Sequence, residues 1–173
     1  LDACKVHGIK NISLRFFNAS GAGFGIGEHH EPETHLIPLI LQVPLGKRDC
    51  IKLFGNDYPT KDGTCVRDYI HVLDIAKAYE LALKAIEQGK EGKYNLGTGK
   101  GHSVKEVIAV AKEVTKLPIK VIEEARRDGD PPFLIASGEK ARKELGWKPE
   151  YSLKEIVQSA WEWHRKNPDG FKE

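Results

Sequence analysis

The chain has 173 residues, of which 40% are apolar and 30% charged, and its formal net charge is +2. This composition is typical of a folded globular protein, shows no concentrated basic run that would point to nucleic acid, and has no apolar stretch near the roughly 18 residues of a membrane span. Cys4, Cys50 and Cys65 are odd in number and far apart, which favours reduced thiols in a cytoplasm over a disulfide framework or a zinc site.

The first ten residues, LDACKVHGIK, are typical of the end of a helix, with Gly8 at the position of a C-terminal cap. The chain also contains no methionine. Because a natural domain seldom starts inside a helix, we expect this sequence to be the C-terminal part of a longer protein.

A strand is predicted over residues 12–17, and the glycine-rich segment NASGAGFGIGEHH follows it. Glycine recurs there at every second position from Gly21 to Gly27. The dinucleotide fingerprint G-x-G-x-x-G needs a glycine five positions after the first, where Ile26 or Glu28 stands instead. We therefore expect that this loop does not hold a dinucleotide.

The next segment, GEHHEPETH, has the residue types of a metal site. A zincin helix places two histidines four residues apart, with a glutamate between them. Here His30 and His35 are five apart, about 140° around a helix, and Pro32 lies between them. We interpret the segment as a solvated polar loop and expect no bound metal.

Strands and helices are mixed along the rest of the chain, which predicts an α/β or α+β fold. Asp74 is expected to cap a helix that reaches Gln88 and buries apolar residues at helical spacing, among them Tyr79. In the last helix, Ile156 and Trp161 are expected to be buried. The other predicted elements are a helix at 35–45, strands at 51–54, 94–96 and 119–122, and helices at 103–115, 137–145 and 152–164. The helices at 103–115 and 152–164 each start with a capping box, a serine followed three residues later by a glutamate.

Two arginine-containing segments could bind an anion. Arg67 lies in TCVRDYIHVLD, and Arg126 and Arg127 lie in EEARRDGDPP near Asp130. A guanidinium matches phosphate oxygens, and a carboxylate matches ribose hydroxyls. The same arginines could instead pair with the aspartates beside them on the surface, and the residues alone leave both interpretations open.

Catalytic motifs are missing from these 173 residues. No tyrosine is followed four residues later by a lysine, so the Y-x-x-x-K pair of short-chain dehydrogenases is not present. The nucleophile motif G-x-S-x-G is also missing. We therefore expect no catalytic residue in this chain.

Five segments stand out together: LRFFNASGA, LFGNDYPTKDGTCVRDYIHVLDIA, YNLGTGKGHSV, RRDGDPP and WEWHRKNPDGF. They resemble the C-terminal half of the UDP-glucose 4-epimerase family, which belongs to the extended short-chain dehydrogenases/reductases. The resemblance covers essentially all of residues 1–173 and implies an α/β fold. The chain would be the UDP-sugar-binding portion of such an enzyme, with leftover strands of the Rossmann sheet. The N-terminal NAD-binding half would be absent.

The resemblance also implies roles for single residues. Phe17 would border the nicotinamide of NAD, and the glycines after it would let the backbone approach the ligand. The residues expected at the nucleotide sugar are Asn18, His35, Leu36, Lys52, Leu53, Phe54, Arg67, Arg127, Asp130 and Leu134. Among these, the strand from Lys52 to Phe54 would pair with uracil, the two arginines would hold the pyrophosphate, and Asp130 would lie near the ribose. Leu134 would border the C2 substituent of the sugar, and His35 replaces the family's asparagine.

By the same resemblance, the chain would anchor UDP while NAD in the complete enzyme exchanges hydride with C4 of the sugar. The ligands would be UDP-glucose and UDP-galactose, with UDP-N-acetylhexosamines as further candidates, and the chain alone would be inactive. Two alternatives stay open: another nucleotide-sugar enzyme, such as a dehydratase or a uronate epimerase or decarboxylase, or a non-catalytic nucleotide-sugar-binding module. Uncovered sheet edges would favour a homo-oligomer.

Overall fold

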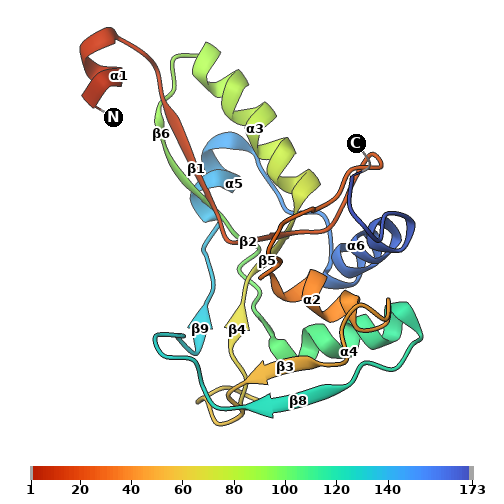
Figure 1. The fold of residues 1–173 in the computed structure, drawn as a ribbon. Helices are drawn as coiled ribbons and strands as arrows, with labels where there is room; N and C mark the ends of the chain where they lie inside the picture. Colours follow the sequence, from red (N-terminus) through yellow and green to blue (C-terminus); the bar gives the residue numbers. More distant parts are fainter. Residues whose placement is uncertain (1, 172–173) are drawn as a thin grey trace.

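A computed structural model of the chain describes residues 2–171, so Leu1, the first residue of the expected helix end, lies outside it. Figure 1 shows the arrangement of the elements. The helices are α1 (Asp2–His7), α2 (Leu36–Gln42), α3 (Val72–Glu87), α4 (Val104–Thr115), α5 (Glu139–Leu145) and α6 (Leu153–Lys166). The strands are β1 (Ile12–Phe16), β2 (Asn18–Ser20), β3 (Ile51–Phe54), β4 (Val66–Arg67), β5 (Tyr69–His71), β6 (Gly92–Leu96), β7 (His102–Ser103), β8 (Val121–Glu124) and β9 (Phe133–Leu134). The mixture of short strands and covering helices confirms the predicted α/β class.

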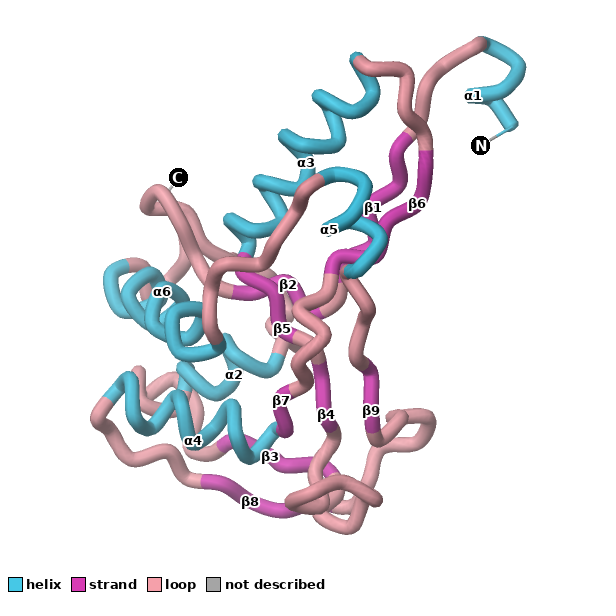
Figure 2. The backbone as a smooth tube through the Cα atoms, turned by 180° about the vertical axis from the view of Figure 1, so that it is seen from behind, coloured by secondary structure: helices cyan, strands magenta, loops and turns pink. Residues whose placement is uncertain are grey.

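The strands form several small sheets rather than one large sheet. Strands β1 and β6, β2 and β5, and β3 and β8 are parallel pairs, while β4 lies between antiparallel β7 and parallel β9. In Figures 1 and 2, the β7–β4–β9 sheet lies between the β1–β6 pair at one end of the molecule and the β3–β8 pair at the other. The chain therefore crosses repeatedly between two ends, each with its own packing.

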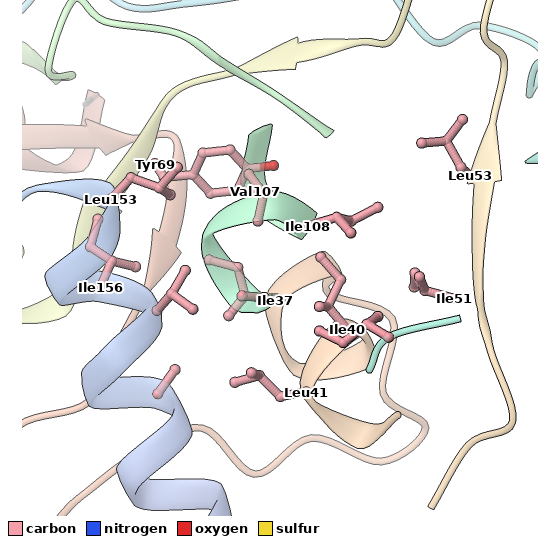
Figure 3. Packing of buried hydrophobic residues seen from close by; sticks show 14 residues of the cluster. Ile37, Ile40, Leu41, Ile51, Leu53, Tyr69, Val107, Ile108, Leu153 and Ile156 are labelled. Atoms are coloured by element: carbon pink, nitrogen blue, oxygen red, sulfur yellow. The ribbon is translucent and has the colours of Figure 1, made fainter. Parts of the chain in front are cut away.

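Two hydrophobic clusters correspond to these two ends. At the β3–β8 end, apolar side chains of α2, α4 and α6 pack together and against β3, with Ile40, Val107 and Ile156 almost completely buried (Figure 3). At the other end, α3 and α5 pack on β1 and β6 around Tyr94 and Trp147. Burial of apolar surface at both ends provides the main driving force for folding.

Several local predictions are confirmed. Strand β3 has the predicted bounds, and both capping boxes are formed, with each serine accepting from a backbone N–H and each glutamate accepting from the cap residue. Strand β8 starts two residues later than predicted, after the buried Ile119. Among residues 2–171, no helix is long and apolar enough to cross a membrane.

The start of α3 differs from the prediction. The cap residue is His71, whose Nδ1 accepts from the backbone N–H of Leu73 at 3.1 Å. Asp74 lies inside the first turn, and its carboxylate accepts from the backbone N–H groups of Glu150 and Tyr151 at 3.0 and 3.4 Å. Asp74 therefore ties α3 to the segment before α6 instead of capping its own helix.

Two aromatic side chains also differ from the prediction. Tyr79 is exposed, because α3 turns the neighbouring Ala78 toward the core instead. In α6, Trp163 is buried and donates from its indole N–H to the carbonyl of Glu28 at 3.2 Å, whereas Trp161 only borders the core. Both errors concern which residues of an amphipathic helix face the core, which helical spacing alone does not fix.

Candidate functional site

A cleft of about 840 Å³ opens beside β3 and β4. It is lined by residues from β1, β2, α2 and the segment before it, β3, β4, β5, the start of α4 and the segment before β9. Nine of the eleven site residues expected from the sequence line it. They are Phe17, Asn18, His35, Leu36, Lys52, Phe54, Arg67, Arg127 and Asp130. Residues separated by more than a hundred positions in the chain thus meet in one place.

The other two expected residues lie outside the lining of the cleft. Leu53 is only 1% exposed and packs in the hydrophobic cluster, because β3 alternates its side chains between the two faces. Leu134 is 45% exposed and lies in β9 opposite Arg67 in the parallel register. Leu134 is therefore a surface residue next to a cleft residue, and is not part of the core.

One edge of β3 is available for hydrogen bonding. The strand pairs with β8 on one side only, and within residues 2–171 no strand pairs with its other side. Its residues Ile51, Lys52 and Phe54 line the cleft. Unpaired N–H and C=O groups on a strand edge can pair with a planar group that has complementary donors and acceptors.

Arg67 is held in place by several hydrogen bonds. Its side chain is 14% exposed, and Nη1 donates to the carbonyls of Val66 and Pro131 at 2.9 and 2.8 Å. Nη2 lies 3.3 Å from Oδ1 of Asp130. The prediction left open a surface pair with the neighbouring Asp68, and the structure shows a different partner, which also lines the cleft.

Asp68 has a separate task behind the cleft. It is completely buried, and its carboxylate accepts from the backbone N–H groups of Thr98, Gly99 and Ala136 and from the Thr98 hydroxyl. These four hydrogen bonds compensate the burial of the carboxylate, so that it needs no cation beside it. Asp68 therefore fixes the loop after β6 and the segment after β9 next to Arg67.

The adjacent arginines Arg126 and Arg127 have different surroundings. Nε of Arg126 lies 2.7 Å from Oδ1 of Asp57, and its guanidinium stacks on the ring of Tyr58. The guanidinium of Arg127 lies 4.0 Å above the ring of Phe54 in the cleft, and among the described residues it forms no ion pair. Arg127 is thus positioned by an aromatic ring, and its charge is available to an anion.

Three glycines of the loop after β2 lie against side chains of the fold and are not in the cleft lining, while the expected approach of the loop backbone to a ligand stays a prediction. A Cβ atom on Gly21 would lie 2.9 Å from the ring of His71, and one on Gly23 would lie 2.6 Å from Leu73. A Cβ atom on Gly27 would collide with the ring of Trp163. Side chains of α6 and of the start of α3 occupy the space that the missing Cβ atoms leave, so these glycines serve internal packing.

Two glutamates in the cleft lining, Glu28 and Glu33, were missed in the sequence. Their Oε1 atoms lie 2.6 and 3.0 Å from Nδ1 of His35. Burial raises the pKa of the Glu28 carboxyl, the negative charge of Glu33 raises it further, and His35 and His30 lower it in part. This part of the cleft therefore holds negative charge close to imidazole rings.

Arg48 and Tyr69 also line the cleft and were missed. Arg48 lies just before β3, and a cation directly ahead of a predicted strand was the only signal for it. Burial raises the pKa of the Tyr69 hydroxyl far above its usual value. Tyr69 therefore stays protonated near neutral pH and is no proton acceptor in this structure.

Comparison with known proteins places this geometry in a family. The chain matches the family described as GDP-mannose 4,6 dehydratase over residues 2–160. It is 52% identical to the UDP-glucose 4-epimerase of Halalkalibacterium halodurans over 171 residues, which cover 96% of this chain and 51% of that protein. The chain thus spans about half the length of the curated relatives it matches.

Solved structures show the same relationship. A crystal structure of a UDP-glucose 4-epimerase is 47% identical with a TM-score of 0.94, and covers 99% of this chain and 55% of its own. The enzyme of Bifidobacterium longum, crystallised with NAD+ and UDP, is 40% identical with a TM-score of 0.90, over 98% of this chain and 52% of its own. The chain belongs to the family described as GDP-mannose 4,6 dehydratase, and within it resembles UDP-glucose 4-epimerases over about half of their length.

Proposed function

We propose that the cleft binds the UDP part of a UDP-hexose, and that residues 1–173 are the UDP-sugar-binding portion of a UDP-glucose 4-epimerase. One observation carries the proposal. Nine residues that the resemblance assigns to nucleotide-sugar or cofactor binding come from distant parts of the chain and line a single cleft.

Each part of UDP has a matching feature in the cleft. Arg127, whose charge has no acidic partner among residues 2–171, and the firmly held Arg67 would bind the pyrophosphate. The unpaired edge of β3 would pair with uracil through its backbone groups. Asp130 already accepts from Arg67 and would also accept from a ribose hydroxyl.

An epimerase has to bind the nucleotide part of its substrate tightly and the sugar part loosely. The sugar must turn over between hydride loss and hydride return, so it has to be held loosely, while a firmly bound nucleotide keeps the intermediate in place. Binding energy from the part of the substrate that does not react serves this purpose. The cations and the strand edge of this cleft suit the nucleotide part, which is the role we assign to the chain.

NAD would supply hydride acceptance and return in the complete enzyme. The glycine loop of this chain lacks the G-x-G-x-x-G spacing for the phosphates of a dinucleotide, and side chains of α6 and of the start of α3 fill the space beside three of its four glycines. Phe17 at the cleft is the one residue of this chain that we place next to NAD. We therefore expect the chain alone to bind UDP without binding NAD tightly and without epimerising UDP-galactose.

A second candidate function, binding of a GDP-sugar, follows from the matching family, which is described as GDP-mannose 4,6 dehydratase. In that case the strand edge would face guanine instead of uracil. The smaller pyrimidine and the larger purine present different donors and acceptors to the same backbone groups. Discrimination between UDP and GDP therefore separates the two candidates.

Isothermal titration calorimetry of the chain with UDP, GDP and UMP tests the proposal. We expect UDP to bind more tightly than GDP, and UMP to bind more weakly than UDP, because UMP lacks the second phosphate. Tighter binding of GDP would favour the second candidate. Failure of both diphosphates to bind, in a chain shown to be folded by circular dichroism, would contradict the nucleotide-binding role altogether.

A further inference from the structure

The segment from Glu28 to His35 brings three potential metal ligands together and places a fourth, Glu28, beside one of them. One ligand atom from each of His30, Glu33 and His35 lies within 4.8 Å of the other two. Oε1 of Glu28 lies 2.6 Å from Nδ1 of His35. Glu28, Glu33 and His35 line the cleft, so the cluster lies at its wall.

The segment is not helical, so the five-residue interval between His30 and His35 does not keep their side chains apart. Residues 27–35 form an irregular stretch with a bend, and α2 starts only at Leu36. The interval of five residues between His30 and His35 excludes a shared face only on a helix. In the observed loop the two rings meet edge to face, with their centroids 5.1 Å apart.

The loop holds its side chains in defined positions. The backbone N–H groups of Thr34 and His35 both donate to Oε1 of Glu33 at 2.8 Å, which orients this carboxylate. The indole N–H of Trp163 donates to the carbonyl of Glu28, which fastens the loop to α6. Ligands that are already oriented lose less entropy when they bind a metal ion.

The charges of the cluster favour a cation. The side chains of Glu28 and Glu33 are only 27% and 10% exposed, and both approach Nδ1 of the same histidine. Two partly buried carboxylates that face the same nitrogen repel each other. A divalent ion at this position would neutralise both.

We propose that His30, Glu33 and His35, together with Glu28, form a binding site for Zn²⁺ or a similar transition-metal ion. Imidazole nitrogens with carboxylate oxygens suit such ions, whereas Mg²⁺ and Ca²⁺ take oxygen ligands. Tetrahedral bonds of about 2.0–2.2 Å separate the ligand atoms by roughly 3.3–3.6 Å. The contacts of 2.6 and 3.0 Å at Nδ1 of His35 would widen by less than about 1 Å around an ion, and the longer separations within the cluster, up to 4.8 Å, would shorten by up to about 1.5 Å.

Titration of the untagged chain with Co²⁺, followed by visible absorbance, tests this site, and calorimetry with Zn²⁺ gives the affinity. We expect a single site with the absorbance of a four-coordinate ion. His30→Ala, His35→Ala and Glu33→Gln should each weaken Zn²⁺ at least tenfold. Glu31→Gln, in the same loop but outside the cluster, and His7→Ala, in α1, are the matched controls and should leave the affinity unchanged.

Thermal melts of each variant show whether it is folded, and Glu33→Gln keeps the shape of the side chain. Equal affinities in all five variants, or no Co²⁺ binding by the folded chain, would overturn the proposal. The assay contains no nucleotide, so its outcome is independent of whether the cleft binds UDP.

Discussion

Two groups of residues in the cleft differ in the secondary structure that carries them and in their charge. The strand-borne group lies on or next to β3, β4 and β9 and consists of Lys52, Phe54, Arg67, Arg127 and Asp130. The loop-borne group consists of Glu28, Glu33 and His35 ahead of α2. The first group carries mostly positive charge on a backbone that rests on the core, and the second crowds two carboxylates around one imidazole.

The difference shows how stability and binding are combined in one cleft. In the strand-borne group, Arg67 stabilises the fold through the same guanidinium that we assign to the nucleotide. In the loop-borne group, burial opposes ionisation of the Glu28 carboxyl, so the charged carboxylate lowers the stability of the fold. Groups that are held in place at a cost to the fold are typical of sites that bind something.

The largest effect should come from removing the support under the strand-borne group. Leu53→Ala deletes a buried side chain between Lys52 and Phe54, and we expect the free energy of unfolding to fall by about 2–5 kcal/mol. Leu83→Ala on α3, where leucine is 64% exposed, should change it by less than about 0.5 kcal/mol. Urea denaturation measures both, and similar losses would mean that β3 does not rest on the core as described.

A smaller loss is expected when Arg67 itself is replaced. Arg67→Ala removes the donors to two carbonyls and the partner of Asp130, so unfolding should become easier by about 1.5–3 kcal/mol. Arg127→Ala should lower stability by less than about 1 kcal/mol, because Arg127 stacks on Phe54 but forms no ion pair among the described side chains. Denaturation curves that rank the two arginines in the opposite order would contradict the assignment.

Leu134 belongs to neither group, and we propose that it affects only the sugar. It is exposed beside Arg67, and because leucine is smaller than tyrosine we expect it to leave room for an acetamido group at C2. We expect the complete enzyme to accept both UDP-galactose and UDP-N-acetylgalactosamine, with the former preferred. Leu134→Tyr should lower kcat/KM for the acetylated sugar alone, by about 1–3 kcal/mol in activation free energy. If the parent already rejects that sugar as strongly as the variant, Leu134 has no part in selectivity.

The smallest change in the free energy of unfolding should come from a substitution in the loop-borne group, and this substitution should stabilise the chain. Because the pKa of Glu28 is raised above its ordinary value of 4.5, the folded chain binds this proton more tightly than the unfolded chain does. The contribution of Glu28 to stability is therefore full below that value and is lost as the pH rises through the folded pKa. Glu28→Gln should raise the free energy of unfolding at pH 7 by less than about 1 kcal/mol, with solvent screening included. Denaturation at pH 4 and pH 7 measures the change, and a clear loss of stability at pH 7 would show that the pair with His35 outweighs burial.

The same contrast explains what could be predicted from the sequence. Strand β3 and the capping boxes at Ser103 and Ser152 depend on neighbours in the chain, and they were predicted correctly. The two-residue strands β4 and β9 depend on pairing across more than sixty residues, which periodicity cannot reveal. The acidic partner of Arg67, Asp130, was likewise fixed by tertiary contact.

The loop-borne group shows a second limit. His30 and His35 lie in an irregular loop, as predicted, but the sequence could not show that this loop brings their rings together. The packing of His71 and Trp163 against two of the loop glycines could not be predicted either, because nothing local in the sequence indicates it. Motifs on regular elements could thus be assigned in advance, while loop geometry needed the structure.

The central claim is that the strand-borne cations bind the pyrophosphate of UDP, and two adjacent residues provide its most direct test. Arg127 lies in the cleft without an acidic partner in residues 2–171, while Arg126 is paired with Asp57 outside it. By calorimetry with UDP, Arg127→Ala should weaken binding by about ten- to a hundredfold, the equivalent of one hydrogen bond to a charged group. Arg126→Ala should leave the affinity within about twofold, a change of under half a kcal/mol. Equal affinities for the two variants would contradict the account.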